Sequence, residues 1–197
     1  MVTATVVNGL SVEGIQDMVK MVKAQPQVAK AVFYATTMWK SGFHNEAVVD
    51  VFSLGGVRNY TSRKQPFRIV GDHPQELLGT NKGPTSVELL LSALGHCLAS
   101  GWATYGAHMG IPIEGLRVEV EGDIDLQGML ALPEPGIVPP GYQEIRATYY
   151  VRSWAAREQL EQLAKMAEDL SPTLHSLRAV KFTSRLIIDE MTDEGIA

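Results

Sequence analysis

The chain has 197 residues, of which 45% are apolar and 20% are charged, and its formal net charge is −5. This composition is typical of a globular protein and excludes a globally disordered or collagen-like chain. The negative charge argues against nucleic acid as the main partner. The single cysteine, Cys97, excludes an intrachain disulfide framework and a cysteine-based zinc site.

The N-terminus shows no signal peptide, because it has neither a basic start nor a long apolar segment. We therefore expect a cytoplasmic protein. The most apolar stretch, residues 87–109, contains Glu88, His96 and His108. These polar side chains argue against a membrane span, so no membrane partner is expected.

The first third of the chain predicts a helix followed by a hairpin. Apolar residues recur at helical spacing over residues 11–23, and Ser11 is suited to cap the N-terminus of that helix. Further along, Gly42 can turn the chain between two segments rich in β-formers. Strands are expected over residues 31–39, 46–54 and 67–70.

The clearest helical pattern lies at the centre of the chain, over residues 85–109. Its leucines point to several sides of the helix axis, which predicts burial nearly all round. Thr85 and Glu88 have the spacing of a capping box. Small residues recur every four positions and predict close packing of another helix. They are Gly95, Ala99, Ala103 and Ala107.

Alternating apolar and polar residues predict further strands in the second half of the chain. An amphipathic helix is expected over residues 155–170, ended by Ser171 and Pro172, and a long proline-rich loop over residues 127–142. This order of elements predicts an α+β fold in which antiparallel sheet covers buried helices. The strands are expected over residues 116–124, 144–152 and 179–188.

Cys97 is the main candidate for chemistry. It lies in the middle of a predicted helix, away from the N-terminal dipole that lowers a thiol pKa, so a reactive thiolate would need a cation supplied by tertiary structure. The alternative is a small buried apolar residue. His96 adjoins it in sequence but points about 100° away on a helix, so the two do not form a dyad. The five histidines lack metal-ligand spacing, and nucleotide, esterase and metalloprotease motifs are absent. We expect no metal or cofactor.

Glu88 allows two interpretations. It can complete the capping box with Thr85, or it can orient an arginine near the thiol. Glu88 lies nine positions before Cys97, which corresponds to about 13 Å along a helix and to roughly opposite faces. A long arginine or a second subunit would have to connect the two residues.

One segment, residues 83–99, reads GPTSVELLLSALGHCLA and contains both Glu88 and Cys97. With four other segments it closely resembles the OsmC and organic hydroperoxide resistance superfamily, in the family order across residues 30–188. The resemblance implies an intertwined homodimer, with sheets wrapped around long central helices and sites at the dimer interface. The other segments are residues 110–116, 120–125, 140–146 and 170–172.

On this resemblance we divide the chain into three parts. Residues 1–28 are expected to form a helical N-terminal extension, and residues 29–190 the OsmC-like domain. Residues 191–197 are expected to form an acidic C-terminal tail.

The resemblance also implies thiol peroxidase chemistry. In such enzymes one cysteine attacks the O–O bond of an organic hydroperoxide, and a second cysteine resolves the sulfenic acid. Cys97 matches the nucleophile and Glu88 the carboxylate that orients an arginine. Arg63 is the best match for that arginine, with Arg58 as its rival. Ser171 stands in place of the second cysteine, so an external thiol would have to reduce Cys97.

Three functions stay open at this point. The first is a one-cysteine reductase of small apolar hydroperoxides that serves oxidative-stress defence. The second is a non-enzymatic dimer that binds a small apolar ligand, with Cys97 not redox-active. The third is a structural dimer in which Cys97 is buried and inert.

Overall fold

The computed structural model describes residues 5–177, so the strand expected over residues 179–188 and the tail expected over 191–197 lie outside the described residues. The described residues form an α+β fold, as predicted, with four antiparallel sheets. The helices are α1 (Val12–Ala24), α2 (Ser86–Met109), α3 (Leu126–Met129), α4 (Arg157–Asp169) and α5 (Pro172–Ser176). The strands are β1 (Val6–Val7), β2 (Leu10–Ser11), β3 (Ala31–Phe33), β4 (Thr36–Ser41), β5 (His44–Val49), β6 (Phe52–Leu54), β7 (Val57–Asn59), β8 (Phe67–Gly71), β9 (Gly115–Ile124) and β10 (Tyr142–Arg152).

Within residues 5–177, no helix has the combination of length and apolar content that crossing a membrane requires.

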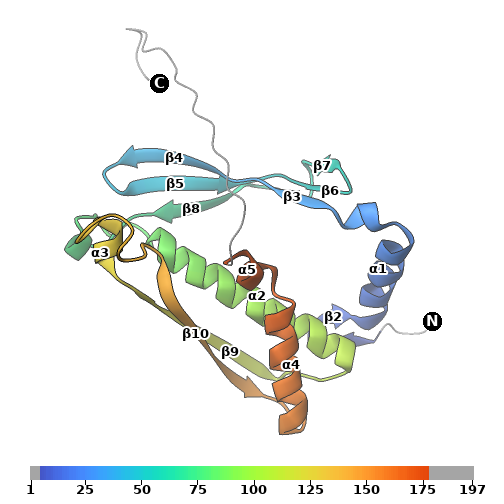
Figure 1. Cartoon of the computed structure of the whole chain (residues 1–197). Coiled ribbons are helices and arrows are strands. Elements are labelled where there is room, and N and C mark those ends of the chain that lie inside the picture. The colour runs from blue at the N-terminus through green and yellow to red at the C-terminus, as the bar shows by residue number, and fades with distance from the viewer. Residues whose placement is uncertain (1–4, 178–197) are drawn as a thin grey trace.

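Helix α1 begins where the sequence predicted. The Ser11 hydroxyl caps it by accepting a hydrogen bond from the backbone N–H of Gly14 at 3.0 Å. The short β1–β2 hairpin just before α1 is fastened to the end of α2 by one side chain. The Asn8 amide donates to the carbonyl of Ile111 at 3.0 Å and accepts from the N–H of Ile113 at 2.8 Å. Helix α1 is thereby held beside the C-terminal end of α2 (Figure 1).

Two of the expected strands were wrong in extent, because each is broken in two. The segment 31–39 forms β3 and β4, and the segment 46–54 forms β5 and β6. The predicted pairing is confirmed, since β4 pairs with β5 around Gly42 and β3 pairs with β6. At the break, the Asp50 carbonyl accepts a hydrogen bond from the Arg63 side chain at 3.0 Å rather than from the opposite strand. The two halves of each segment belong to separate three-stranded sheets, β3–β6–β7 and β4–β5–β8.

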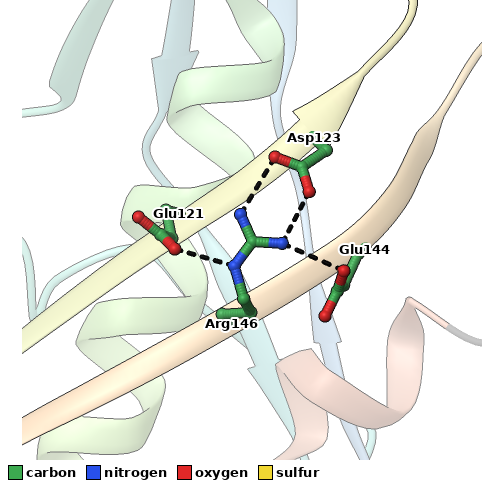
Figure 2. Close-up of polar contacts among 4 residues, drawn as sticks. All are labelled: Glu121, Asp123, Glu144 and Arg146. Atoms are coloured by element: carbon green, nitrogen blue, oxygen red, sulfur yellow. Dashed lines mark hydrogen bonds and ion pairs between the residues drawn. The ribbon is translucent and has the colours of Figure 1, made fainter.

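The β9–β10 hairpin forms the sheet on the other side of α2 (Figure 1). Its alternation is as predicted, with apolar residues on the face toward α2 and charged residues outside. On the outer face, Arg146 bonds to the carboxylates of Glu121, Asp123 and Glu144 (Figure 2). Glu121 lies directly opposite Arg146 in the ladder. Such cross-strand pairs favour this register over a shifted one.

Helix α2 begins with the predicted capping box. The Thr85 hydroxyl accepts from the N–H of Glu88 at 3.3 Å, and the Glu88 carboxylate accepts from the N–H of Thr85 at 2.7 Å. The helix is not buried all round, however. Leu90 is 37% exposed, because in the single chain the β9–β10 hairpin and α4 leave part of the helix uncovered. The buried apolar core consists of Leu94, Leu98, Trp102, Ala107, Ile111, Leu163 and Ala167.

The stripe of small residues on α2 faces a strand, not another helix, at its first residue. A Cβ on Gly95 would lie 3.5 Å from a methyl group of Val120, so this part of the stripe faces β9. The close helix contact is made instead by Gly101. A Cβ there would lie 3.1 Å from the Cβ of Ala167, which is why α4 can approach α2 at this point.

Candidate functional site

The structure brings Cys97 together with Ser171. Cys97 lies midway along α2 and is partly buried, and its Sγ is 3.1 Å from the Oγ of Ser171. Ser171 sits at the junction of α4 and α5 and is only 2% exposed. The position that matched the second cysteine of the peroxidases thus meets the thiol directly, across 74 residues of sequence.

Local sequence fixes Ser171 at this junction. Its hydroxyl caps α5 by accepting from the N–H of Leu174 at 3.1 Å. Pro172 occupies the first turn of α5, where its missing N–H costs nothing. Serine followed by proline therefore ends α4, as predicted, and starts a new helix pointing elsewhere. The same geometry turns the serine hydroxyl toward α2.

Two opposing effects act on the pKa of the Cys97 thiol. Burial raises the pKa of the Cys97 thiol, but hydrogen bonds from the Ser171 side chain and from the Thr173 side chain and backbone lower it by more. The net pKa lies below the ordinary value. A lowered pKa at a partly exposed position is what a reactive thiol requires. The cation that the sequence suggested is not the cause, because no charged group among the described residues contributes to this shift.

In the described chain, Glu88 completes the capping box of α2 with Thr85. Besides the backbone contact, its carboxylate accepts from the Thr85 hydroxyl at 2.8 Å. The hydrogen bonds from the Thr85 backbone and side chain lower the pKa of Glu88. Within residues 5–177 its hydrogen bonds reach no arginine.

The two candidate arginines belong to the sheet region away from the thiol. The Arg63 guanidinium lies over the rings of Phe52 and Phe67, at 5.4 and 5.3 Å from their centroids. The Arg58 guanidinium lies over Tyr34 at 4.6 Å. In the described part of a single chain, neither arginine contacts Cys97.

His96 points away from Cys97, as predicted. Its Nδ1 donates at 2.7 Å to the carbonyl of Ser92, which lies in the preceding turn of α2. His96 also lines an open groove of about 600 Å³ between α2 and β9. The groove was not predicted from the sequence, although small residues on α2 opposite the apolar face of a strand are the pattern that indicates one. Its apolar lining residues are Leu91, Gly95, Ala99, Leu116, Val118 and Val120.

The described residues contain no group of three or more His, Cys, Asp and Glu side chains placed to hold a metal ion.

The sequence profile of a family described as OsmC-like protein matches residues 79–185, which is more than half of the chain. The chain therefore belongs to the OsmC-like family. No curated protein matches the sequence.

Solved structures of OsmC-like proteins share the fold. An OsmC-like protein from Mycoplasma pneumoniae is 19% identical, with a TM-score of 0.58 over 76% of this chain and 89% of that one. An organic hydroperoxide resistance protein from Elizabethkingia anophelis is 16% identical, with a TM-score of 0.52 over 75% of this chain and 88% of that one. An organic hydroperoxide resistance protein OsmC from Legionella pneumophila is also 16% identical, with a TM-score of 0.51 over 75% and 89% of the two chains.

Proposed function

We propose that this OsmC-like protein is a one-cysteine organic hydroperoxide reductase that serves oxidative-stress defence. The observation that supports the proposal most is the environment of Cys97, where neutral donors lower the thiol pKa at a partly exposed position. A lowered pKa gives a larger fraction of thiolate at neutral pH, and the thiolate is the nucleophile. The proteins from Elizabethkingia anophelis and Legionella pneumophila, with the same fold, carry hydroperoxide resistance in their names.

The reaction divides into an oxidative and a reductive half. The Cys97 thiolate attacks one peroxide oxygen, so that an S–O bond forms, the O–O bond breaks and the alkoxide leaves and takes up a proton as the alcohol. The sulfenic acid on Cys97 then reacts with an external thiol, which releases water and leaves a mixed disulfide. A second external thiol frees Cys97 and carries away the disulfide. Ser171 takes no covalent part, since a hydroxyl cannot form a disulfide.

We infer that the working unit is a homodimer. In the single chain, part of α2 is uncovered and the sheets β3–β6–β7 and β4–β5–β8 expose large apolar side chains such as Phe33 and Trp39. A second copy that covers both surfaces would remove this apolar area from water. In such an assembly Arg63, or its rival Arg58, would approach Cys97 of the other copy, with Glu88 orienting the arginine.

The test of the proposed chemistry is the intact mass of reduced protein after exposure to equimolar cumene hydroperoxide. Because Cys97 is the only cysteine, an adduct that a sulfenic-acid trap captures reports on this sulfur alone. We expect a rapid gain of one oxygen in the wild type and none in Cys97→Ser. No gain over minutes in the wild type would overturn the proposal. Comparing the oxidation rates of Arg63→Ala and Arg58→Ala then separates the two arginines. Only the loss of the arginine that acts on Cys97 should slow the oxidation.

The groove between α2 and β9 favours a second candidate function, the binding of a small apolar molecule. Its apolar lining and its position beside α2 suit an alkyl chain. Titration with a fluorescent fatty-acid probe tests this, with Val120→Glu as the variant that places a charge in the lining. Binding by the wild type and by Cys97→Ser, but not by Val120→Glu, together with no oxidation of Cys97, would favour the binding protein over the enzyme.

A further inference from the structure

We propose that Ser171 is the positioning residue of Cys97, and that its hydroxyl proton is donated to the sulfur and holds it as a thiolate ready to attack. The inference rests on the proposed function, because it concerns the same sulfur and explains how a chain without a second cysteine activates the first. It assigns a role to the residue that separates this chain from the two-cysteine pattern. Three observations support it.

The first observation concerns the only proton on the Ser171 hydroxyl. A hydroxyl has one proton to donate and two lone pairs to accept with. The N–H of Leu174 donates to Ser171 Oγ and so occupies a lone pair. The remaining contact of this oxygen within the described residues is Cys97 Sγ, at 3.1 Å. The serine proton is therefore available to the sulfur, and when Cys97 is ionised the serine must be the donor, since a thiolate can only accept.

The second observation is that the backbone of Ser171 is held in place at the junction of two helices. Its backbone N–H donates to the carbonyl of Glu168 at 3.2 Å, and its own carbonyl accepts from the N–H of His175 at 3.0 Å. Both hydrogen bonds belong to helix ends, one closing α4 and one opening α5. With 2% of its surface exposed, Ser171 meets little competing water. A hydrogen bond in such surroundings is stronger than the same bond in water.

The third observation is that the donors around Cys97 are neutral. The groups that lower its pKa are the Ser171 hydroxyl and the side chain and backbone of Thr173, with no charged group among the described residues. An arginine supplied by a second copy would act through charge, which salt screens. The Ser171 contribution should be insensitive to salt. The two sources of thiolate stabilisation can therefore be measured separately in one protein.

The experiment is the pH dependence of iodoacetamide alkylation of Cys97 in full-length wild type, Ser171→Ala and Ser171→Thr, at low and high salt. We expect Ser171→Ala to raise the thiol pKa by about one unit, which is a tenfold loss of thiolate at pH values below the pKa, because hydrogen bonds to charged groups are among the stronger ones. Ser171→Thr keeps a hydroxyl at the same place and should restore the wild-type pKa. The difference between wild type and Ser171→Ala should be the same at both salt concentrations.

A structural role alone predicts another pattern. If the hydroxyl mattered only as the cap of α5, Ser171→Ala would lower thermal stability and leave the thiol pKa unchanged, and this result would overturn the proposal. A difference that disappears at high salt would also overturn it, since the stabilisation would then come from charge. Should Ser171→Ala fail to fold, Ser171→Cys provides the second measurement. A disulfide between positions 97 and 171 after mild oxidation would support the contact, and its absence in a folded protein would contradict it.

These outcomes are distinguishable from failure of the proposed function. Alkylation measures the thiolate without any hydroperoxide. If Ser171→Ala shows the expected rise in thiol pKa but the wild type gains no oxygen from cumene hydroperoxide, the proposed reductase function is wrong and the role of Ser171 is supported. If the wild type gains oxygen as expected but the thiol pKa is unchanged in Ser171→Ala, the reductase function is supported and the role of Ser171 is wrong.

Discussion

The two halves of the chain differ in how they bury apolar side chains. In the described part of the chain, every buried hydrophobic core residue comes from α2 or from the residues after it. The sheets β3–β6–β7 and β4–β5–β8 instead leave Phe33, Trp39 and Val57 about three-quarters exposed, at 73%, 73% and 72%. Single exposed apolar residues are ordinary, but several on adjoining sheets form the kind of surface that proteins use for association. The half with Cys97 thus buries an apolar core of its own, whereas the sheets of the other half leave apolar side chains that a second copy, as proposed, would cover.

The largest expected effect is the contrast between two tryptophans, one from each half. Trp102 is 2% exposed in the core, and Trp39 is 73% exposed on β4. Replacing a buried large aromatic residue with alanine typically costs about 3–5 kcal/mol, and we expect this loss for Trp102→Ala in urea unfolding. For Trp39→Ala, measured on dilute monomer, we expect less than about 1 kcal/mol, as is usual for surface sites.

The same two tryptophans also differ in their expected effect on self-association. If the β4–β5–β8 sheet is covered by a second copy, sedimentation velocity should show that Trp39→Ala weakens self-association while the monomer stays folded. Trp102→Phe is the control: it fills most of the core volume of the tryptophan, so it should stay folded and associate like the wild type. Equal unfolding losses in the two alanine variants at high dilution would show that the halves do not differ in the way described.

A smaller effect is expected at the start of α2, where the two halves join. Thr85 is 8% exposed and caps the helix, so Thr85→Ala should lower the free energy of unfolding by about 1–2 kcal/mol. Glu88 adds a pH dependence, because hydrogen bonds from Thr85 lower its pKa. The folded pKa lies below the unfolded one, so the stabilisation is complete above about pH 4.3 and is lost as the pH falls through the folded pKa. Urea unfolding should show a difference between wild type and Glu88→Gln at neutral pH that shrinks in acid.

That measurement also separates the two roles of Glu88. A capping residue alone predicts that Glu88→Gln changes stability and leaves the oxidation rate of Cys97 unaltered. Slower oxidation at unchanged stability would instead place Glu88 in the reaction, through an arginine of the second copy.

Much of the fold follows from local patterns in the sequence. The capping box at Thr85 and Glu88 requires only residues three positions apart, and it begins α2 as predicted. The alternation of β9 and β10 likewise predicts their faces, because side chains along a strand point in turn to opposite sides. The breaks in the hairpin strands have no such local signal. At the break, the contact that the structure shows to the Asp50 carbonyl comes from the Arg63 side chain, 13 residues away in sequence.

The candidate site shows the same division. The family resemblance singled out Cys97 and Ser171, but their contact depends on how α4 and α5 pack against α2, which no local pattern contains. The direction of the small-residue stripe could not be read from the sequence either. Spacing predicts that such residues share a helix face and does not say whether a helix or a strand covers that face.

The smallest expected effect separates two glycines of α2 by what each one faces. At Gly95 an added Cβ would lie 3.5 Å from Val120, an ordinary contact, whereas at Gly101 it would lie 3.1 Å from the Ala167 Cβ and 3.2 Å from its Cα. Alanine in a helix is favoured over glycine by about 0.8–1 kcal/mol, so Gly95→Ala should raise the free energy of urea unfolding by up to that amount. Gly101→Ala gains the same propensity but must push α4 away, and overpacking of a core typically costs about 1–3 kcal/mol. We therefore expect Gly101→Ala to be less stable than Gly95→Ala. If Gly101→Ala were instead the more stable variant, α4 would move aside at little cost. The core between α2 and α4 would then be less tightly packed than its buried residues indicate.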